Sequence, residues 1–445
     1  MFIELNSLTS IGELKVTGAS QQYKETRLMD GDLSFNPVTV NGNRIDSQTD
    51  SVEIQLSSLS SAPFEWVAGL FYLNEDLDNA FLSRREFAVN PGTNLPNLDE
   101  PINKWEPWLN EIRLETQSLA AYAQADFKLT DMFTLVAGLR YTDDSREWDI
   151  FGQNPDNREM LDFSVLEVED ASGDWNKLTW RLGLNAQLTS SSLAYASVST
   201  GFLAGNAQGA FRADQTYDEQ EVIAYEAGYK AAFFDRQLRV QLAAYYNDFE
   251  DLLSTRFDDI NGTAVAVFGN AGAVTAKGVE AEVNWSVTPD WDLTMMATLT
   301  NAEYGDFVTP NPLASGGETI NGIDNLLQLD GEQVQQTPDY TVTLQSNYYI
   351  DLGDNGSLQP SISVYITDDY RTNDLPWTYG TQEGYARVDA SITWNSFDGN
   401  FSVQAFANNV TDEEILVRSV RFGGDIIVGD YAPPATYGIR AGYKF

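Results

Sequence analysis

Apolar and polar residues alternate along most of the chain, and the period expected of a helix is nearly absent. In the stretch 133–144, FTLVAGLRYTDD, every second residue from Phe133 to Tyr141 is apolar, and small or polar residues mostly stand between them. Successive side chains of a β-strand point to opposite faces, so this spacing predicts a strand with one apolar and one polar face. The same alternation recurs at 223–234, 278–287, 385–394 and 436–445.

The polar face and the length of these segments indicate which solvent the apolar face meets. A soluble sheet with one buried side shows the same alternation. Here, however, the polar face mixes charged residues with glycine, so it contacts water rather than a packed core. There are about 17 segments, most of roughly 10 to 18 residues, whereas soluble strands average about five or six. A tilted membrane strand needs about 9 to 11 residues, so segment length favours lipid.

The connections alternate between short and long. Short turns fall at 58–63, 129–131, 189–192, 234–236, 288–291, 352–357 and 396–400. Long connections fall around 27–47, 80–111, 149–174, 203–219, 254–263, 305–335, 371–383 and 413–434. Tight periplasmic turns and long extracellular loops are typical of outer-membrane barrels. The sequence therefore predicts an all-β fold, a transmembrane antiparallel β-barrel.

Composition removes several classes of function. The chain has 66 acidic and 26 basic residues, a net charge of -40, which argues against binding a nucleic-acid backbone. It contains no cysteine and no histidine. Disulfides, thiolate metal sites and histidine-dependent catalysis are therefore excluded, and we expect no enzyme activity, no cofactor and no bound metal. No apolar run approaches the roughly 18 residues of a membrane-spanning helix.

Four stretches resemble the barrel portion of the TonB-dependent outer-membrane receptors. They are FTLVAGLRYTDD at 133–144, LAYASVSTGFLAGNA at 193–207, the hairpin at 217–252, and FANNVTDEEI at 406–415 together with the terminal strand. Their order and spacing carry the resemblance, which spans most of residues 50–445. The chain departs from the family pattern after NNVTDEE, where a tyrosine usually follows and isoleucine stands here.

The resemblance implies an active importer in the outer membrane of a Gram-negative bacterium. Such a receptor is a barrel of about 22 strands, closed by an N-terminal plug on which TonB pulls. Its typical ligands are ferric siderophores, cobalamin or oligosaccharides. The terminal aromatics Tyr443 and Phe445 resemble the signal read by the barrel-assembly machinery; alternatively, they belong to an aromatic girdle at the surface of the outer-membrane lipid.

The resemblance also implies that residues 1–445 are a partial barrel domain. No signal peptide, TonB-contacting segment or plug is recognisable before the first predicted strand. Counted back from a final strand that runs toward the periplasm, the segment 1–7 is the sixth strand of about 22, with about five absent. We therefore expect TonB to act only through a missing N-terminal region. Our hypothesis is that this chain alone neither inserts nor transports.

Six residues in predicted extracellular loops are candidate ligand contacts: Trp105, Trp108, Trp377, Tyr379, Arg418 and Arg421. The aromatic rings could stack on a sugar or a catechol, and the arginines could clamp an anionic ligand through forked hydrogen bonds. The alternatives are that the rings pack their own loops or form the girdle, and that the arginines pair with neighbouring carboxylates.

Four other functional interpretations compete with this one. Without a plug, a large barrel would be a passive, porin-like channel, or the chain would be a non-functional gene fragment. A membrane-embedded hydrolase would need a serine or carboxylate centre without histidine, and no such constellation is present. A soluble secreted β protein would purify without detergent, which a lipid-facing band prevents.

Overall fold

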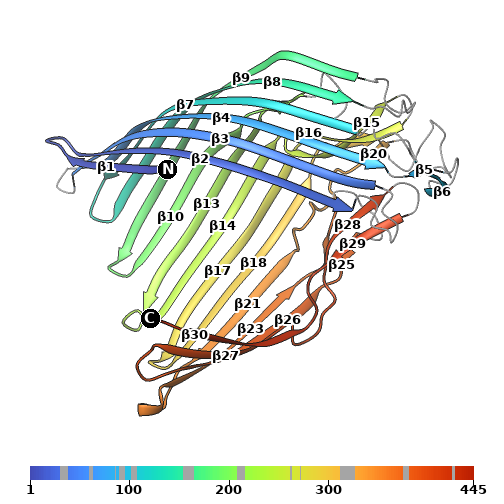
Figure 1. Cartoon of the computed structure of the whole chain (residues 1–445). Coiled ribbons are helices and arrows are strands. Elements are labelled where there is room, and N and C mark those ends of the chain that lie inside the picture. Colours follow the sequence, from blue (N-terminus) through green and yellow to red (C-terminus); the bar gives the residue numbers. More distant parts are fainter. Residues whose placement is uncertain are drawn as a thin grey trace.

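The computed structural model describes residues 1–445 apart from 31–38, 60–63, 86, 90–95, 102–107, 154–164, 208–215, 261–262, 271, 311–325, 374–379 and 423–425. One large antiparallel sheet forms most of the described chain, and small hairpins lie beyond one end of it (Figure 1). Within the described part of the chain, no helix is long and apolar enough to cross a membrane.

Eighteen strands make up the large sheet. They are β1 (Phe2–Leu8), β2 (Glu13–Asp30), β3 (Thr39–Ser57), β4 (Glu65–Arg85), β7 (Trp108–Lys128), β8 (Phe133–Gln153), β9 (Val165–Thr189), β10 (Ser192–Leu203), β13 (Gln220–Phe233), β14 (Leu238–Glu250), β17 (Val274–Thr288), β18 (Trp291–Tyr304), β21 (Tyr340–Tyr348), β22 (Ile350–Asp351), β23 (Ser357–Thr367), β26 (Tyr385–Asn395), β27 (Phe401–Asn408) and β30 (Thr436–Tyr443).

In the described part of the chain, the loops carry six two-stranded hairpins and one short 3-10 helix, η2 (Gly353–Asn355). The hairpins are β5 (Phe87–Val89) with β6 (Pro96–Pro101), β11 (Asn206–Ala207) with β12 (Thr216–Tyr217), β15 (Leu253–Ile260) with β16 (Thr263–Asn270), β19 (Val308–Pro310) with β20 (Leu326–Gln328), β24 (Tyr370–Arg371) with β25 (Thr381–Gln382), and β28 (Leu416–Phe422) with β29 (Ile426–Tyr431).

Every strand of the sheet pairs antiparallel with its neighbours in chain order. β22 continues β21 along β23 after Tyr349, so the wall has 17 strand positions. The 17 segments predicted from the sequence are thereby confirmed. Each of the seven predicted short turns lies between two consecutive wall strands.

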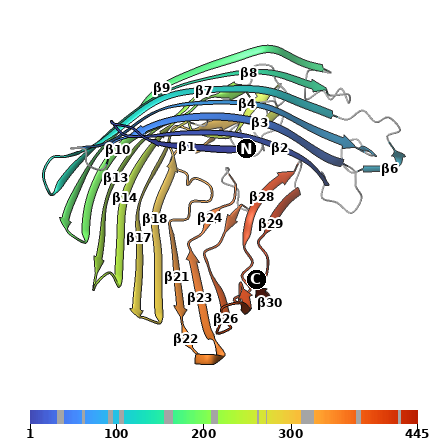
Figure 2. The same ribbon diagram turned by 60° about the vertical axis from the view of Figure 1, so that its left-hand side comes forward.

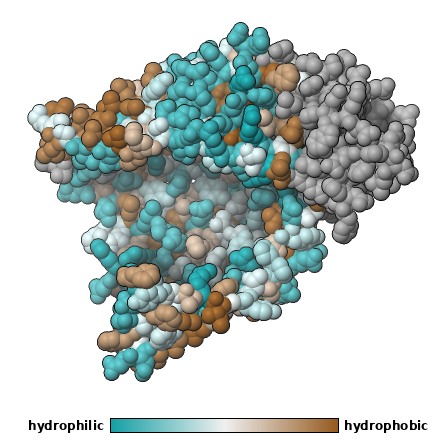
Figure 3. All heavy atoms as spheres, viewed as in Figure 1, coloured by the Kyte–Doolittle hydropathy of each residue, from teal (hydrophilic) through white to brown (hydrophobic). Residues whose placement is uncertain are grey.

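The sheet curls into an open trough (Figures 1 and 2). β1 lies at one edge of the sheet and β30 at the other, and each pairs on one side only among the described residues. The molecule is hollowed between these two edges, and hydrophilic and pale residues are frequent there (Figure 3).

The predicted outward faces are confirmed. On β8, Leu139 and Tyr141 are 57% and 47% exposed, and on β30, Tyr437 and Ile439 are 81% and 78% exposed. Large apolar side chains in solvent-facing positions are unfavourable in water but suit hydrocarbon. The intervening Arg140 lies on the opposite, concave face.

The wall strands β2, β3, β4, β7, β8 and β9 are longer than a membrane crossing requires. β9 has 25 residues and β8 has 21, against about 9 to 11 for a crossing. Their ends nearest the loops (Figure 1) therefore extend beyond the membrane. The prediction of loops at 27–47 and 149–174 is wrong at both ends of each, since β2 runs to Asp30, β3 begins at Thr39, β8 runs to Gln153 and β9 begins at Val165.

The loop end of the sheet has a small hydrophobic core of its own. Val274, Tyr304, Phe307 and Leu329 are almost fully buried against one another. The rings of Tyr304 and Phe307 have centroids 5.4 Å apart. This cluster fixes the chain that follows β18 onto the ends of β14 and β17, so part of the loop layer is a packed structure.

Candidate functional site

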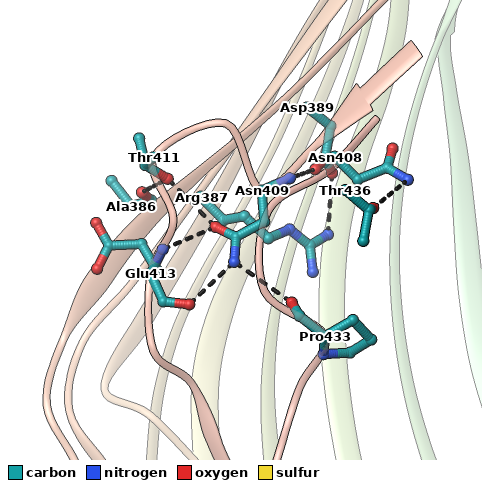
Figure 4. Close-up of polar contacts among 9 residues, drawn as sticks. All are labelled: Ala386, Arg387, Asp389, Asn408, Asn409, Thr411, Glu413, Pro433 and Thr436. Carbon is teal, nitrogen blue, oxygen red and sulfur yellow. Dashed lines mark hydrogen bonds and ion pairs between the residues drawn. The ribbon is translucent and has the colours of Figure 1, made fainter. Parts of the chain in front are cut away.

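The first feature of the loop end is a polar knot centred on Asn409, at the end of β27 (Figure 4). Asn409 is only 3% exposed, and its backbone N–H donates to Asp389 Oδ1 of β26 at 2.7 Å. Its Nδ2 donates to the carbonyls of Glu413 at 2.9 Å and Pro433 at 3.5 Å. The Asn409 backbone has φ 51°, a left-handed conformation that asparagine tolerates better than most residues.

Neighbouring residues of NNVTDEEI complete the knot. Thr411 Oγ1 donates to the carbonyl of Ala386 at 3.1 Å, and Asp412 Oδ1 accepts from the N–H of Ala435 at 2.9 Å. The motif therefore joins β26, β27 and the start of β30, so the β28–β29 hairpin leaves the wall from a fixed point. Ile415, where the family pattern has tyrosine, is 4% exposed and fills the position with an apolar side chain.

Two successive loops dock on each other beside this knot. Thr372 Oγ1 lies 2.9 Å from Ser419 Oγ on β28, and both residues are buried. Asn373 Nδ2 donates to the same hydroxyl at 3.0 Å, and Gln382 Oε1 accepts from the N–H of Leu416 at 2.6 Å. The loop after β23 and the β28–β29 hairpin are thus held together by buried hydrogen bonds, whose loss would leave unpaired polar groups.

A third loop joins the same assembly. Arg371 on β24 forms an ion pair with Glu332, and its Nη1 donates to the carbonyl of Gln333 at 3.3 Å. Close by, burial raises the pKa of Tyr370 above its usual value of 10.0. The described parts of the loops that follow β18, β23 and β27 are therefore connected to one another. We call this connected layer of loops the rim.

Three of the six candidate ligand residues lie within the described part of the chain. Trp105, Trp377 and Tyr379 lie outside the described residues, while Trp108 begins β7. Arg418 and Arg421 are on β28, where Arg418 is exposed and stands opposite Asp430 of β29.

The hydrogen bonds of Thr372 bring together the ends of one loop and join it to another. Its backbone N–H donates to the carbonyl of Gly380 at 2.6 Å, so the described residues on the two sides of 374–379 lie together beside Ser419 of β28. Trp377 and Tyr379 fall in the interval between them, outside the described residues. The strand that begins with Trp108 pairs with β4 and β8, away from this pair of loops.

The two terminal aromatics are exposed. Tyr443 is 62% exposed at the end of β30, and its ring meets that of Phe445 edge to face with centroids 5.2 Å apart. Neither is buried against the rest of the wall, so both are accessible to lipid or to a partner.

The concave face carries a repeated pairing of tyrosine with glycine. A Cβ on Gly69 would lie 2.5 Å from the ring of Tyr122, and a Cβ on Gly228 would lie 2.5 Å from the ring of Tyr195. Each ring therefore lies flat over a glycine of the neighbouring strand. The hydroxyl of Tyr122 donates to Glu53 at 2.7 Å, and that of Tyr195 donates to Glu226.

Beside Tyr122, two arginines line a hollow of about 450 Å³ on this face. Arg140 is on β8 and Arg181 is on β9, and the lining also includes Gln124, Thr179 and Ser199. Across the described residues, no group of three or more acidic side chains is arranged to hold a metal ion. The concave face can thus offer guanidinium, hydroxyl and amide groups to a polar solute.

Sequence reasoning missed Asn409, Arg140 and Arg181 as site residues. Asn409 was visible only as part of a motif that carried a family resemblance, and its partners come from distant strands. The arginines stood on the polar face of predicted strands, like many other charged residues. They become neighbours only through the β8–β9 register, and the long connection between these two strands does not reveal that register in the sequence.

These features define the class of protein: a wall of an outer-membrane β-barrel with a polar concave face and a layer of hairpins beyond one end. The family model described as TonB dependent receptor-like, beta-barrel matches residues 6–410, and the chain belongs to this family. Its members are receptors and transporters rather than enzymes, and the chain is a protein of the outer membrane of a Gram-negative bacterium.

Among sequence relatives, the pesticin receptor of Yersinia enterocolitica is 22% identical over 333 residues, which are 72% of this chain and 44% of that protein. The outer membrane porin G of Escherichia coli is 24% identical over 198 residues, covering 43% of this chain and 61% of the porin. The chain therefore spans less than half the length of the pesticin receptor.

Among solved structures, the ferric yersiniabactin uptake receptor from Yersinia pestis superposes with a TM-score of 0.78 at 18% identity. The match covers 99% of this chain and 60% of that receptor. At this identity the likeness shows the fold alone, and it agrees with the antiparallel wall described above.

Proposed function

We propose that this chain is the wall of a TonB-dependent importer that takes up a scarce ligand such as a ferric siderophore, cobalamin or an oligosaccharide. The observation that carries the proposal is the family match over residues 6–410. Two structural relatives, a ferric yersiniabactin uptake receptor and a siderophore receptor from Acinetobacter baumannii, favour a siderophore among these ligands. In this proposal, TonB acts through a region that precedes the barrel wall.

Ligand contacts are proposed at the rim. Arg418 and Arg421, with Trp377 and Tyr379 of the adjoining loop, would form one contact region, because Thr372 and Ser419 hold the two loops together. Trp105 and Trp108 would form a second region on the long-stranded side. Aromatic rings would stack on planar ligand groups, and the arginine forks would bind ligand anions.

The terminal aromatics are proposed to have a separate role in assembly. Tyr443 and Phe445 would be read by the barrel-assembly machinery before the wall meets lipid. Their exposure supports this proposal, because a side chain packed into the wall could not be bound by a partner.

Deletion of the gene in its native bacterium tests the import function. The deletion strain should lose accumulation of one iron-labelled siderophore under iron limitation, and complementation should restore it. Dissipating the proton gradient should abolish accumulation in the wild type, because TonB-driven import requires energy. Unchanged accumulation of ferric siderophores, cobalamin and oligosaccharides in the deletion strain would contradict the proposal.

The similarity to an outer membrane porin favours one second candidate, a passive channel. The two functions differ in their need for energy. Uptake through a passive channel persists when the proton gradient is dissipated, and the purified protein would conduct ions constitutively across a planar bilayer.

A further inference from the structure

The hollow on the concave face contains two arginines at neighbouring positions of adjacent strands. Arg140 stands opposite Thr179 in the β8–β9 pairing, and Arg181 stands opposite Gly138. The two residues are therefore diagonal neighbours on one face, a separation of about 7 to 8 Å between their backbones. Both line the same hollow.

The Arg140 side chain is held in place before any ligand arrives. Its guanidinium lies 5.7 Å from the ring centroid of Phe71 and 5.8 Å from that of Tyr122. Its Nε donates to Thr142 Oγ1 at 3.0 Å. Stacking and this hydrogen bond fix the plane of the guanidinium, and they leave its two terminal nitrogens for another partner.

Neither arginine has an acidic partner, although acidic residues outnumber basic ones in this chain by 40. Neither Arg140 nor Arg181 forms an ion pair with a carboxylate anywhere in the described part of the chain. One carboxylate, that of Glu53, also lines the hollow, and it accepts the hydroxyl of Tyr122. The hollow thus holds two guanidinium groups against one carboxylate, and this excess of positive charge attracts an anion.

We propose that Arg140 and Arg181 form an anion-binding site on the concave wall, and that its ligand is a small organic anion with at least two carboxylates. Two guanidinium forks favour this class, because a di- or tricarboxylate can offer each fork a carboxylate of its own, whereas a monocarboxylate has only one to share. Thr179, Ser199 and Gln124 add hydroxyl and amide groups to the lining, which suits a hydroxyl-bearing acid.

The physiological meaning of this site rests on the proposed import function, since a carboxylate-bearing ligand would pass along this wall. The binding of an anion by the two arginines does not depend on import. A binding experiment in vitro tests the site whether or not the cell imports the ligand, so either proposal can fail without the other.

Citrate is the probe, titrated calorimetrically into the full chain in detergent micelles. Arg140→Gln and Arg181→Gln should each weaken citrate binding about tenfold, the loss of one charge-assisted contact. Arg113→Gln is the matched control, since Arg113 pairs with Asp78 and Glu111 away from this hollow. Acetate should bind more weakly than citrate, and about 0.3 M salt should weaken both.

Two further variants keep the test decisive. Arg140→Lys keeps the charge but not the fork, so it should retain part of the affinity. Arg181 is exposed, so Arg181→Gln carries the test even where Arg140→Gln disturbs the wall. The proposal is overturned if Arg181→Gln binds citrate as the wild type does, or if Arg113→Gln lowers the affinity as much.

Discussion

Asn408 and Asn409 are sequence neighbours that the fold uses in different ways. Asn408 is exposed, and its side chain makes one long hydrogen bond, 3.5 Å to Thr436. Asn409 is buried and joins β26 to the segments that precede β28 and β30. The pair therefore separates the effect of losing an asparagine from the effect of losing the knot.

Replacing Asn409 should destabilise the loop end of the wall. Asn409→Ala leaves the Glu413 and Pro433 carbonyls without this donor, at a cost of about 2 to 3 kcal/mol. Asn408→Ala should change stability by less than about 0.5 kcal/mol. Urea unfolding in detergent, followed by tryptophan fluorescence, gives both values, and equal effects of the two variants would contradict the role assigned to Asn409.

The carboxylate of Asp398 holds the turn between β26 and β27 through hydrogen bonds. Asp398 accepts hydrogen bonds from the Ser396 hydroxyl at 2.6 Å and from the N–H of Asn400 at 3.1 Å. The Ser396 hydrogen bond, followed by those from Asn400, lowers the pKa of Asp398 below its usual 3.8. The folded turn thus binds a proton less readily than the unfolded chain does.

The turn should consequently lose stability in acid. Because the folded-state pKa is the lower one, the stabilisation is fully present above pH 3.8 and disappears as the pH falls through the folded-state pKa. Hydrogen exchange of a peptide covering the turn, corrected for intrinsic rates, should be faster in Asp398→Asn than in wild type at neutral pH. The difference should vanish in acid; Asp354→Asn, in the preceding turn, serves as control.

At the scale of the element, each tyrosine–glycine pair leaves room for the tyrosine ring over the neighbouring strand. Gly69 gives Tyr122 the space to lie over β4, and in that position the tyrosine hydroxyl reaches Glu53 on β3. One ring thereby connects three strands through contacts that the backbone ladder alone does not make. By contrast, a Cβ on Gly18 of β2 would meet nothing within 4 Å.

This contrast gives a paired test. Gly69→Ala forces the Tyr122 ring away and should destabilise the wall by about 1 to 3 kcal/mol, the usual cost of overpacking. Gly18→Ala should be neutral or slightly stabilising, since it reduces the freedom of the unfolded chain. Thermal denaturation of both variants in detergent measures the difference, and destabilisation by Gly18→Ala alone would refute the explanation.

The strands also show which parts of the fold the apolar alternation predicts and which it does not. Apolar alternation predicted β8 and β30 with the correct outward residues, because lipid demands an apolar side chain at every second position. It failed at the loop ends of β2, β3 and β9, where water lies on both faces and residues such as Arg27, Asn43 and Asp170 carry no apolar signal. The contact between Thr372 and Ser419 was equally invisible, since a pair of loops 47 residues apart is joined only by the fold.

At the scale of the whole molecule, the trough has two edges. The backbone of β1 pairs only with β2, and that of β30 pairs only with β27, within the part of the chain that is described. In hydrocarbon, each unpaired backbone group costs several kcal/mol, which is why spanning sheets close on themselves. β1 and β30 also run in the same direction, because they are the first and last of 17 antiparallel positions, an odd number, so direct closure would require a parallel pair.

This chain by itself should therefore fail to form a stable bilayer-spanning barrel. After reconstitution into liposomes, it should remain open to protease and migrate identically on a gel with and without boiling, whereas a closed barrel examined in parallel resists protease and shifts on heating. A protease-resistant, heat-modifiable form of this chain would show that the two edges are paired, with each other or with a second copy. Crosslinking of cysteines introduced at Ile3 and Ile439 would then distinguish these pairings, because a link within one copy gives a monomer and a link between copies gives a dimer.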